Sequence, residues 1–384
     1  TVPLQPGNKS LSEVVVVGYG TRIKRDVTSS ISRITAKEFQ DQPLPSFEQA
    51  LQGRAAGVFI NAGSGKLGQA MDIRVRGIAS ISAGSQPLIV IDGVPVYNSP
   101  LGTDVEADNP LAALNPNDIE SMEVLKDAAS SAIYGARGSN GVILVTTKSG
   151  KAGRTRLNVN VSHGWSDPTH KRETMNAGQY KDLLGTAIKN AFGVADEDLA
   201  DFWNSQLAAP DLDEWNGGYD ENWSERSFQK GYVSQYSVSM SGGDARTKYL
   251  LSGGYNDQKG ILLGNRLSRA TGRLNLEHAA TDRLKLGANI ALFRSANYRV
   301  VNDNAFANPM QLNALAPIQP AYLPDGSLND FTIYYNNLID QKFTSNTGVG
   351  FKTISSIYGE LQLIPGMLML RSQAGVDFNN YQEE

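Results

Sequence analysis

The chain of 384 residues contains no cysteine and only three histidines. The lack of cysteine excludes a disulfide framework and any thiolate metal site. The histidines, His163, His170 and His278, are scattered and lack the spacing of metal ligands, so we expect neither a metal nor a cofactor. Positive charge is also scarce, because the net charge is -4. The chain therefore offers no basic surface for phosphate, which disfavours nucleic acid as a partner.

Long apolar runs are absent as well. No stretch approaches 18 consecutive apolar residues, so the sequence predicts no membrane-spanning helix. The mean hydropathy of -0.31 would suit a soluble protein. Transmembrane β-strands can have such a value too, because half of the residues in each strand are polar. Thr1 begins a polar segment with two prolines instead of a secretory signal. We therefore expect the chain to lack its natural start.

Motifs for catalysis and ligand binding are missing too. The segment 63–66, GSGK, is similar to a phosphate-binding loop, but Leu67 replaces the required Ser or Thr. Asp104, Glu106 and Asp108 lack the glycine of a calcium loop, so a solvated loop is the better interpretation. No GxSxG motif occurs. We therefore expect that the protein is not an enzyme.

What the sequence does contain is glycine, 38 residues of it, and a regular alternation of apolar and polar residues after Arg154. In the first such segment Leu157, Val159 and Val161 share one face, while asparagines and a serine share the other. A length of about ten residues per strand suits a tilted crossing of a bilayer, with the apolar face toward lipid. Seven segments show the pattern: 155–165, 232–241, 248–256, 273–277, 284–292, 357–363 and 368–378. A soluble β-sandwich would also alternate in this way.

The connections between these segments favour a membrane barrel. Three are short, at 242–246, 279–282 and 365–366, and they alternate with long ones at 166–231, 257–268 and 295–347. Short turns on one rim and long loops on the outer rim are typical of outer-membrane barrels. A barrel with a plugged lumen has about 22 strands, so seven strands cannot close around a folded domain. We therefore expect the chain to be part of a longer protein.

The first long loop has structure of its own. Apolar residues at helical spacing between Tyr180 and Ile188 predict a helix packed against its neighbours. Several aromatic residues in or near this loop could stack on sugars, although packing within the loop explains them equally well: Trp203, Trp215, Tyr219, Trp223 and Tyr232.

The residues before position 150 predict a small α+β domain. Ser46 is a good N-cap for a helix that runs to about Gln52, and a strand follows from Val58. Further strands are expected at 73–76 and 88–91, with Asp92-Gly93 as a turn. The last part predicts a strand at 121–125, a helix at 126–134 that Gly135 ends, and a strand at 141–147. The polar surface of this domain suits a contact through water.

Five strings in this domain carry a family resemblance: SEVVVVGYGT (12–21), ALQGRAAGV (50–58), IRVRG (73–77), PLIVIDGVPV (87–96) and SMEVLKDAASSAIYGARGSNGVILVTTKSG (121–150). Together, residues 11–150 resemble the plug of a SusC/RagA-type TonB-dependent outer-membrane transporter. Residues 237–262 and 273–290 are similar to the early barrel strands of the same family. The resemblance implies an α+β plug followed by an antiparallel transmembrane β-barrel, of which the chain holds about seven of roughly 22 strands.

The resemblance also implies a division of the chain and a set of functional residues. We expect an N-terminal segment (1–24), a plug (25–150) and the first part of the barrel (151–384). The run Glu13, Val14, Val15, Val16 and Val17 is interpreted as a Ton box, which TonB binds by β-strand addition. The plug-motif residues, which lie in or between the resembling strings, are Arg74, Arg76, Gly77, Asp92, Gly93, Glu123, Lys126, Tyr134, Gly135, Arg137 and Gly141.

As a function, the resemblance implies active import across the outer membrane of a Bacteroidetes-like Gram-negative cell. Expected partners are TonB with its inner-membrane motor, a SusD-like lipoprotein, the lipids of the outer membrane and an oligosaccharide or peptide cargo. Two other functions stay open: a siderophore or cobalamin receptor without a lipoprotein lid, and a secreted β-rich adhesin or carbohydrate-binding protein. The valine run has no neighbour in sequence with which to pair, so on pattern alone it could also be an edge strand of the plug sheet; the resemblance favours the Ton box.

Overall fold

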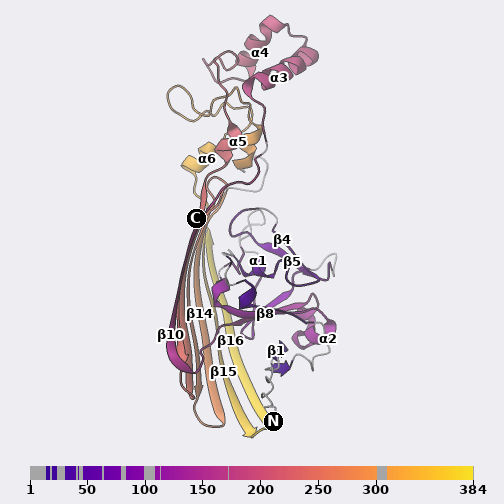
Figure 1. Ribbon diagram of the computed structural model, residues 1–384. Helices are drawn as coiled ribbons and strands as arrows, with labels where there is room; N and C mark the ends of the chain where they lie inside the picture. Colours follow the sequence, from indigo (N-terminus) through magenta and orange to yellow (C-terminus); the bar gives the residue numbers. More distant parts are fainter. Residues whose placement is uncertain are drawn as a thin grey trace, which may run out of the picture.

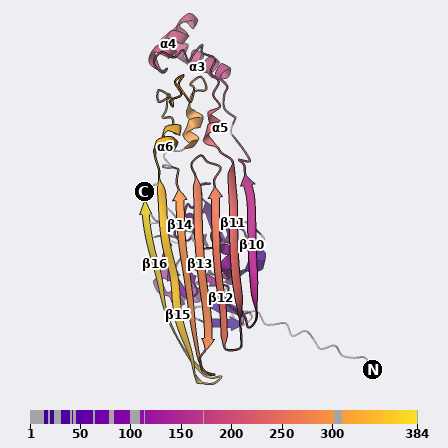
Figure 2. The same ribbon diagram turned by 90° about the vertical axis from the view of Figure 1, so that its left-hand side faces the viewer.

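The computed structural model describes residues 14–17, 20–23, 31–39, 42, 46–62, 65–78, 84–98, 109–112, 114–171, 173–300 and 309–383. Figure 1 shows an α+β domain lying against one face of a tall antiparallel sheet, with helical loops above the sheet. Figure 2, turned by 90°, shows the sheet in front of this domain. No helix in the described ranges combines the length and apolar character needed to span a bilayer.

The α+β domain is built on a mixed five-stranded sheet. In spatial order its strands are β3 (Ile31–Thr35), β8 (Ile119–Leu125), β9 (Val142–Thr147), β6 (Leu88–Ile91) and β7 (Val94–Val96). Only β6 and β9 run parallel. The β-branched residues of β6 and β9 occupy the centre of the sheet, where both faces are covered. A separate antiparallel pair is formed by β4 (Val58–Ala62) and β5 (Met71–Val75).

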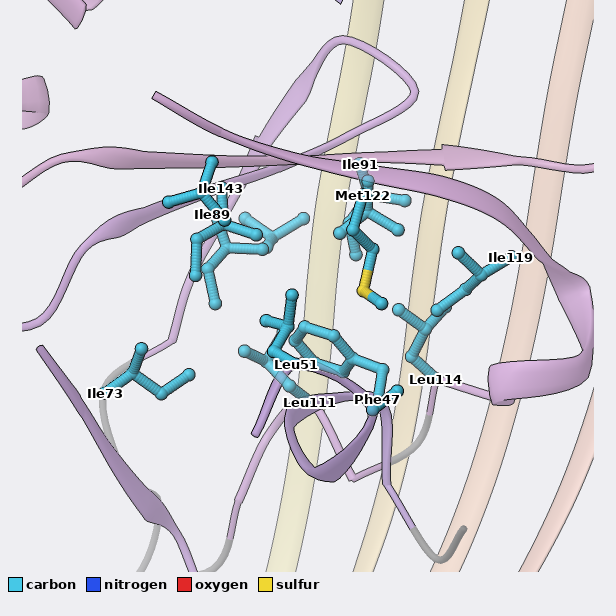
Figure 3. Close-up of a cluster of buried hydrophobic side chains, with 14 of the residues drawn as sticks. Phe47, Leu51, Ile73, Ile89, Ile91, Leu111, Leu114, Ile119, Met122 and Ile143 are labelled. Atoms are coloured by element: carbon cyan, nitrogen blue, oxygen red, sulfur yellow. The ribbon is translucent and has the colours of Figure 1, made fainter. Parts of the chain in front are cut away.

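The core of this domain lies between the five-stranded sheet and helix α1 (Phe47–Leu51). Figure 3 shows Phe47 and Leu51 of the helix facing Ile89, Met122 and Ile143 of the strands. All five side chains are almost completely removed from solvent. Their packing fixes the domain as one unit, because each buried aliphatic side chain contributes about 1.5–3 kcal/mol. The same cluster includes three residues of the tall sheet, Ala291, Phe293 and Ile354.

The expected turns and caps of this domain are largely confirmed. The backbone N–H of Gln49 donates to the Ser46 hydroxyl, 3.5 Å away, which caps α1. Asp92 and Gly93 have φ of 48° and 83°, as a two-residue hairpin turn of type I′ requires. The helix expected at 126–134 is shorter, because α2 (Ala128–Ser131) passes into the 3-10 helix η4 (Ala132–Gly138). Other short 3-10 turns are η2 (Ala36–Glu38) and η3 (Pro116–Asp118).

The tall sheet contains seven antiparallel strands, each paired with its neighbours in chain order. They are β10 (Gly153–Ser166), β11 (Gly231–Gly243), β12 (Thr247–Lys259), β13 (Arg266–Ala279), β14 (Leu284–Tyr298), β15 (Thr347–Ile364) and β16 (Leu368–Glu383). The number of strands agrees with the prediction. The lengths do not, because the strands have 13 to 18 residues instead of about ten. They therefore extend beyond the apolar band and carry the loops away from it.

The connections follow the expected alternation with one correction. Residues 244–246, 280–283 and 365–367 form short turns at one end of the sheet. The connection at 257–268 was expected to be long, but β12 and β13 extend into it and leave only residues 260–265. The loops at 167–230 and 299–346 are long, as predicted.

The two faces of the tall sheet invert the usual arrangement of a soluble protein. On the outer face apolar side chains are open, with Val159 at 66% and Trp165 at 78% exposure. On the face toward the α+β domain polar side chains are buried, with Gln258 at 2% and Lys352 at 3%. A β-sandwich would place its apolar residues between the two layers. The sandwich alternative is therefore wrong for this chain.

The long loops form helical structure above the sheet (Figure 1). Helices α3 (Ala177–Phe192), α4 (Leu199–Gln206), α5 (Trp223–Ser227) and α6 (Leu338–Phe343) belong to them, with η5 (Asp196–Asp198) and η6 (Pro309–Ala314). The expected helix around Tyr180 is confirmed as α3. Trp203 and Trp223 are buried in the loop clusters, which supports packing as their role. The Trp203 indole N–H donates to the buried Glu214 carboxylate at 3.0 Å.

The valine run forms strand β1 (Val14–Val17), and Glu13 lies outside the described residues. Strand β1 pairs in antiparallel fashion with β2 (Gly20–Ile23) as a separate two-stranded sheet. It is not an edge strand of the five-stranded sheet. The expectation that the run has no pairing neighbour in sequence is wrong, because residues 18–19 connect it to a partner.

Candidate functional site

The contact between the α+β domain and the tall sheet is the candidate functional site. Strand β13 places Arg269, Arg273 and Asn275 on its inner face, because side chains two residues apart share a face of a strand. All three residues are almost completely buried. Their partners come from the ends of β6, β8 and β9, so these polar side chains join two parts of the chain that are distant in sequence.

Arg273 lies at the centre of this contact. Its Nη1 donates to Asp92 Oδ2 at 3.2 Å and to the Thr147 hydroxyl at 3.0 Å. Its Nε lies 3.8 Å from Asp118 Oδ2. The Arg273 side chain is only 2% exposed, so the two carboxylates act on it with little screening by solvent. Arg273 therefore ties the turn after β6 and the turn before β8 to the sheet.

Thr147, at the end of β9, organises the groups around Arg273. Its backbone N–H and its hydroxyl donate to the two carboxylate oxygens of Asp92, at 2.9 and 2.7 Å. The same hydroxyl accepts from Asn275 Nδ2 at 3.2 Å, and that amide also donates to the Lys148 carbonyl at 2.6 Å. This arrangement fixes the Asp92 carboxylate in the orientation that faces Arg273.

Arg269 holds the segment before η3. Its Nη1 donates to the carbonyls of Ala112 and Leu114. The carboxylate of Asp118 accepts from the Ser252 hydroxyl of β12 at 2.9 Å. These contacts extend the polar interface along β12 and β13, and the apolar Phe293 and Ile354 continue it on β14 and β15. The interface is polar as expected, but its centre is a direct and buried contact instead of one through water.

Strands β15 and β16 supply a second group of contacts. Lys352 Nζ lies 3.1 Å from Asp377 Oδ1, and both side chains are buried. The Asp377 carboxylate also accepts from the backbone N–H of Tyr97 at 2.7 Å. Gln373 Nε2 donates to the carbonyl of Asp92 at 2.8 Å. Strand β7 and its turn are therefore held by the sheet from two sides.

The Arg273 contact is only partly satisfied. Arg273 Nε and Nη2 are buried and have no hydrogen-bond partner among the described residues. A buried charge with unfilled donors is costly, and exposure to water removes that cost. The interface is therefore strong enough to position the domain. Separating the two surfaces nevertheless recovers part of the free energy, because water then solvates the unfilled donors of Arg273.

The basic plug-motif residues stabilise the domain internally. Arg74 Nη2 lies 2.5 Å from Asp72 Oδ2, and Arg76 Nη1 lies 2.5 Å from Asp127 Oδ1. Arg76 also has φ of 61°, and its N–H donates to the Gly57 carbonyl at 2.8 Å. Together these contacts join the β4–β5 pair to the loop after β8.

Lys126 makes a similar internal link. Its Nζ donates to the Ser32 hydroxyl at 2.7 Å and to the Ala56 carbonyl at 2.8 Å. It thereby connects β3 with the segment between α1 and β4. Arg137 is exposed in η4, and Tyr134 packs against the smaller apolar cluster of β6 and β9.

Two buried carboxyls accompany these contacts. Burial raises the pKa of Glu123, although the Ser121 hydroxyl and the Arg33 guanidinium, 3.2 Å away, act in the opposite direction. Burial also raises the pKa of Glu48, which accepts from Asn109 Nδ2 at 2.6 Å. Both groups lie inside the domain and link its segments to each other.

Four plug-motif glycines have positive φ: Gly77, Gly93, Gly135 and Gly141. At Gly141, with φ of 88°, a Cβ would lie 3.0 Å from Val75 Cβ and 3.2 Å from the Leu125 carbonyl oxygen. Glycine is required there by conformation and by space. Gly135 has φ of 61° but ψ of -149°, so it forms a kink within η4 instead of the expected left-handed cap.

The sequence did not identify the residues of the sheet that hold the domain. The only indication in the sequence was the alternation on β13, which placed Arg273 and Asn275 on the water-facing side of the strand. The alternation did not show that their partners are Asp118 and Thr147. Nothing in the sequence indicated that Arg269 contacts the domain. Of the plug-motif residues, Asp92 and Gly93 lie at the interface, where Gly93 faces the Gln373 side chain. Residues 104–108, considered above as a calcium loop, lie outside the described residues.

Comparisons with known proteins agree with this architecture. Residues 23–142 match the family model of the TonB-dependent Receptor Plug Domain. TonB-dependent receptor P26 of Formosa agariphila is 33% identical over 390 residues, which cover 100% of this chain and 36% of that protein. TonB-dependent receptor SusC of Bacteroides thetaiotaomicron is 32% identical over 355 residues, which cover 90% of this chain and 33% of SusC. The chain thus spans about a third of the length of these curated relatives.

Solved structures give the same result. The RagAB peptide importer in its "open-open" state matches with a TM-score of 0.77 and 28% identity, over 97% of this chain and 43% of the matched chain. The siderophore receptor PirA from Acinetobacter baumannii shares the fold, with a TM-score of 0.55 and 17% identity over 91% of this chain and 40% of that chain. With its plug domain and seven antiparallel strands of barrel wall, the chain belongs to the SusC/RagA-type TonB-dependent receptors.

Proposed function

We propose that the full protein imports an oligomeric nutrient across the outer membrane of a Gram-negative cell, with energy supplied through TonB. The observation that carries this proposal is a folded domain held against the polar inner face of a sheet whose outer face is apolar. A domain in that position would block the lumen of the barrel. Transport therefore requires that the plug move relative to the wall, and no catalytic step is assigned to the protein.

Strand β1 is the proposed handle for that movement. In the described part of the chain it pairs only with β2, so the backbone groups of its other edge are available for an added strand. Each backbone hydrogen bond contributes about 1 kcal/mol net, but several bonds loaded together in shear resist a pull. We propose residues 13–17 as the Ton box, residues 1–24 as the segment that carries it, residues 25–150 as the plug and residues 151–384 as barrel.

The proposed partners follow from the relatives. The similarity to the RagAB peptide importer and to SusC supports a SusD-like lipoprotein as a lid over the long loops, and a peptide or an oligosaccharide as cargo. Cargo held between lid and plug would make the Ton box available to TonB. A receptor that works without a lid is a separate candidate, and co-purification of a lipidated partner with the full-length protein distinguishes the two.

The Ton box assignment is tested in the full-length protein by replacing Val16, whose backbone N–H points away from β2 because hydrogen-bonded pairs alternate along an antiparallel ladder that closes at Val17 and Gly20. Val16→Pro removes this N–H and blocks addition of a strand, whereas Val16→Ala keeps the backbone intact. We expect Val16→Pro, like deletion of residues 13–17, to abolish uptake of labelled oligosaccharides or peptides by cells while cargo binding to the purified protein stays intact. Val16→Ala serves as the matched control. Unchanged uptake with Val16→Pro would refute the assignment.

A further inference from the structure

A large cationic cavity lies between the plug and the inner face of β10 and β11. Its volume is about 1280 Å³. Glu120 is the one acidic residue in its described lining, against six basic residues: Arg33, Lys37, Lys148, Lys151, Arg154 and Arg156. The whole chain has a net charge of -4, so this excess of positive charge is a local feature.

Most of this charge is not neutralised by the protein. Arg33 lies 3.2 Å from Glu123 and Lys151 lies 3.9 Å from Glu120. The other four cations, Lys37, Lys148, Arg154 and Arg156, form no ion pair within the described ranges of the chain. Burial lowers the pKa of the Lys148 ammonium group, although the Asp118 and Glu120 carboxylates act in the opposite direction. Six basic residues against one carboxylate in the described lining create a positive potential that attracts anions.

The rest of the lining suits a polymer rich in hydroxyl or amide groups. Asn158 and Asn160 follow the two arginines on the inner face of β10. They pair across the sheet with Ser239 and Ser237 of β11, which also line the cavity. These neutral polar side chains offer many equivalent hydrogen-bonding groups instead of one specific pocket. Such a surface binds weakly at several positions, and a route for passage needs this property.

We propose that the cargo is an anionic oligomer that carries carboxylate or sulfate groups, and that this cavity is its passage beside the plug. The inference rests on the proposed import function and specifies its substrate class. The cavity lies in the half of the sheet that is next to the short turns, where β10 begins and β11 ends.

The test uses the full-length protein in detergent and two pairs of probes of equal length. One pair is tetragalacturonate and maltotetraose, and the other is tetra-aspartate and tetraserine. Arg154→Gln combined with Arg156→Gln removes two cations of the cavity. The matched control is Arg246→Gln combined with Arg283→Gln, which removes two cations from short turns outside the lining.

At low salt we expect at least one anionic probe to bind at least about tenfold more tightly than its neutral counterpart. The cavity variant should lose about tenfold in that affinity, while the control variant retains it. Added salt should remove the difference, because screening weakens exposed charge pairs. Unchanged hydrogen exchange of the plug in the cavity variant establishes that its fold is preserved.

Equal affinities for anionic and neutral probes, or equal losses in the cavity and control variants, would overturn the proposal. Both outcomes are independent of the import function, because binding to purified protein requires no TonB. Conversely, uptake that persists without residues 13–17 would contradict TonB-driven import and leave the binding result standing.

Discussion

Replacement of Arg273 by methionine tests the contact between plug and wall most sharply. Arg273→Met removes a guanidinium that is 2% exposed and leaves Asp92 and Asp118 facing an apolar side chain. Loss of one partner from a buried pair costs about 3–5 kcal/mol. We expect the lower end of that range, because Asp92 keeps its bonds from Thr147 and Asp118 keeps its bond from Ser252. About 3 kcal/mol corresponds to roughly a hundredfold increase in the open population of the plug.

Hydrogen exchange of the full-length protein in detergent measures this change. Strand β9 should exchange roughly a hundredfold faster in Arg273→Met, because its end is tied to the sheet through Thr147. Arg246→Gln on a short turn is the control and should leave the exchange of β9 unchanged. Adding Asp92→Asn and Asp118→Asn to Arg273→Met removes the uncompensated carboxylates and should restore much of the protection. Exchange in Arg273→Met that matches the Arg246→Gln control would refute the reasoning.

Three further predictions concern single positions. Gly141→Ala should destabilise the plug by about 1–3 kcal/mol in urea unfolding, because the φ of 88° and the close neighbours of Gly141 exclude a Cβ. Gly84→Ala is the control and should leave stability unchanged, because a Cβ at Gly84 would meet open space. Burial raises the folded-state pKa of Glu48, so stability should fall as the pH rises above about 4.5, and Glu48→Gln should flatten that dependence in thermal melts. Glu214→Ala should destabilise the loop helices by about 1–3 kcal/mol, because it leaves the buried N–H donors of Trp203 and Ala209 unpaired. The exposed Glu197→Ala is the control and should have no effect. Hydrogen exchange of α4 measures the difference.

The sequence predicted the strands and their faces well because both depend on local periodicity. In β10 the alternation of Leu157 and Val159 with Asn158 and Asn160 shows which side of the strand is apolar, and no distant contact is needed to read it. The strand ends were predicted poorly. Beyond the apolar band, residues such as Arg266 to Ser268 have no apolar alternation, and pairing with a neighbouring strand decides their conformation.

The contacts between plug and wall could not be predicted from the sequence. Arg273 and Asp92 are 181 positions apart, and nothing local in either segment specifies the other. The helix expected at 126–134 failed for a different reason. The chain tightens into η4, where the local packing of Gly138 against the Ser131 carbonyl and Val142 leaves no room for a Cβ. The valine run was expected to lack a neighbour, yet β2 pairs with it directly after residues 18–19, and Gly18 at the start of that connection was a turn signal that could have indicated the hairpin.

A cross-link between plug and wall tests most directly the claim that the plug must move. A Cβ at Gly375 of β16 would lie 3.4 Å from Val94 Cβ of β7, which is close to the spacing in a disulfide. Val94→Cys with Gly375→Cys should therefore form a disulfide in the full-length protein. We predict that oxidation abolishes uptake of labelled oligomer while leaving cargo binding intact, and that reduction restores uptake. Full uptake with the cross-link confirmed by mass spectrometry would contradict the account.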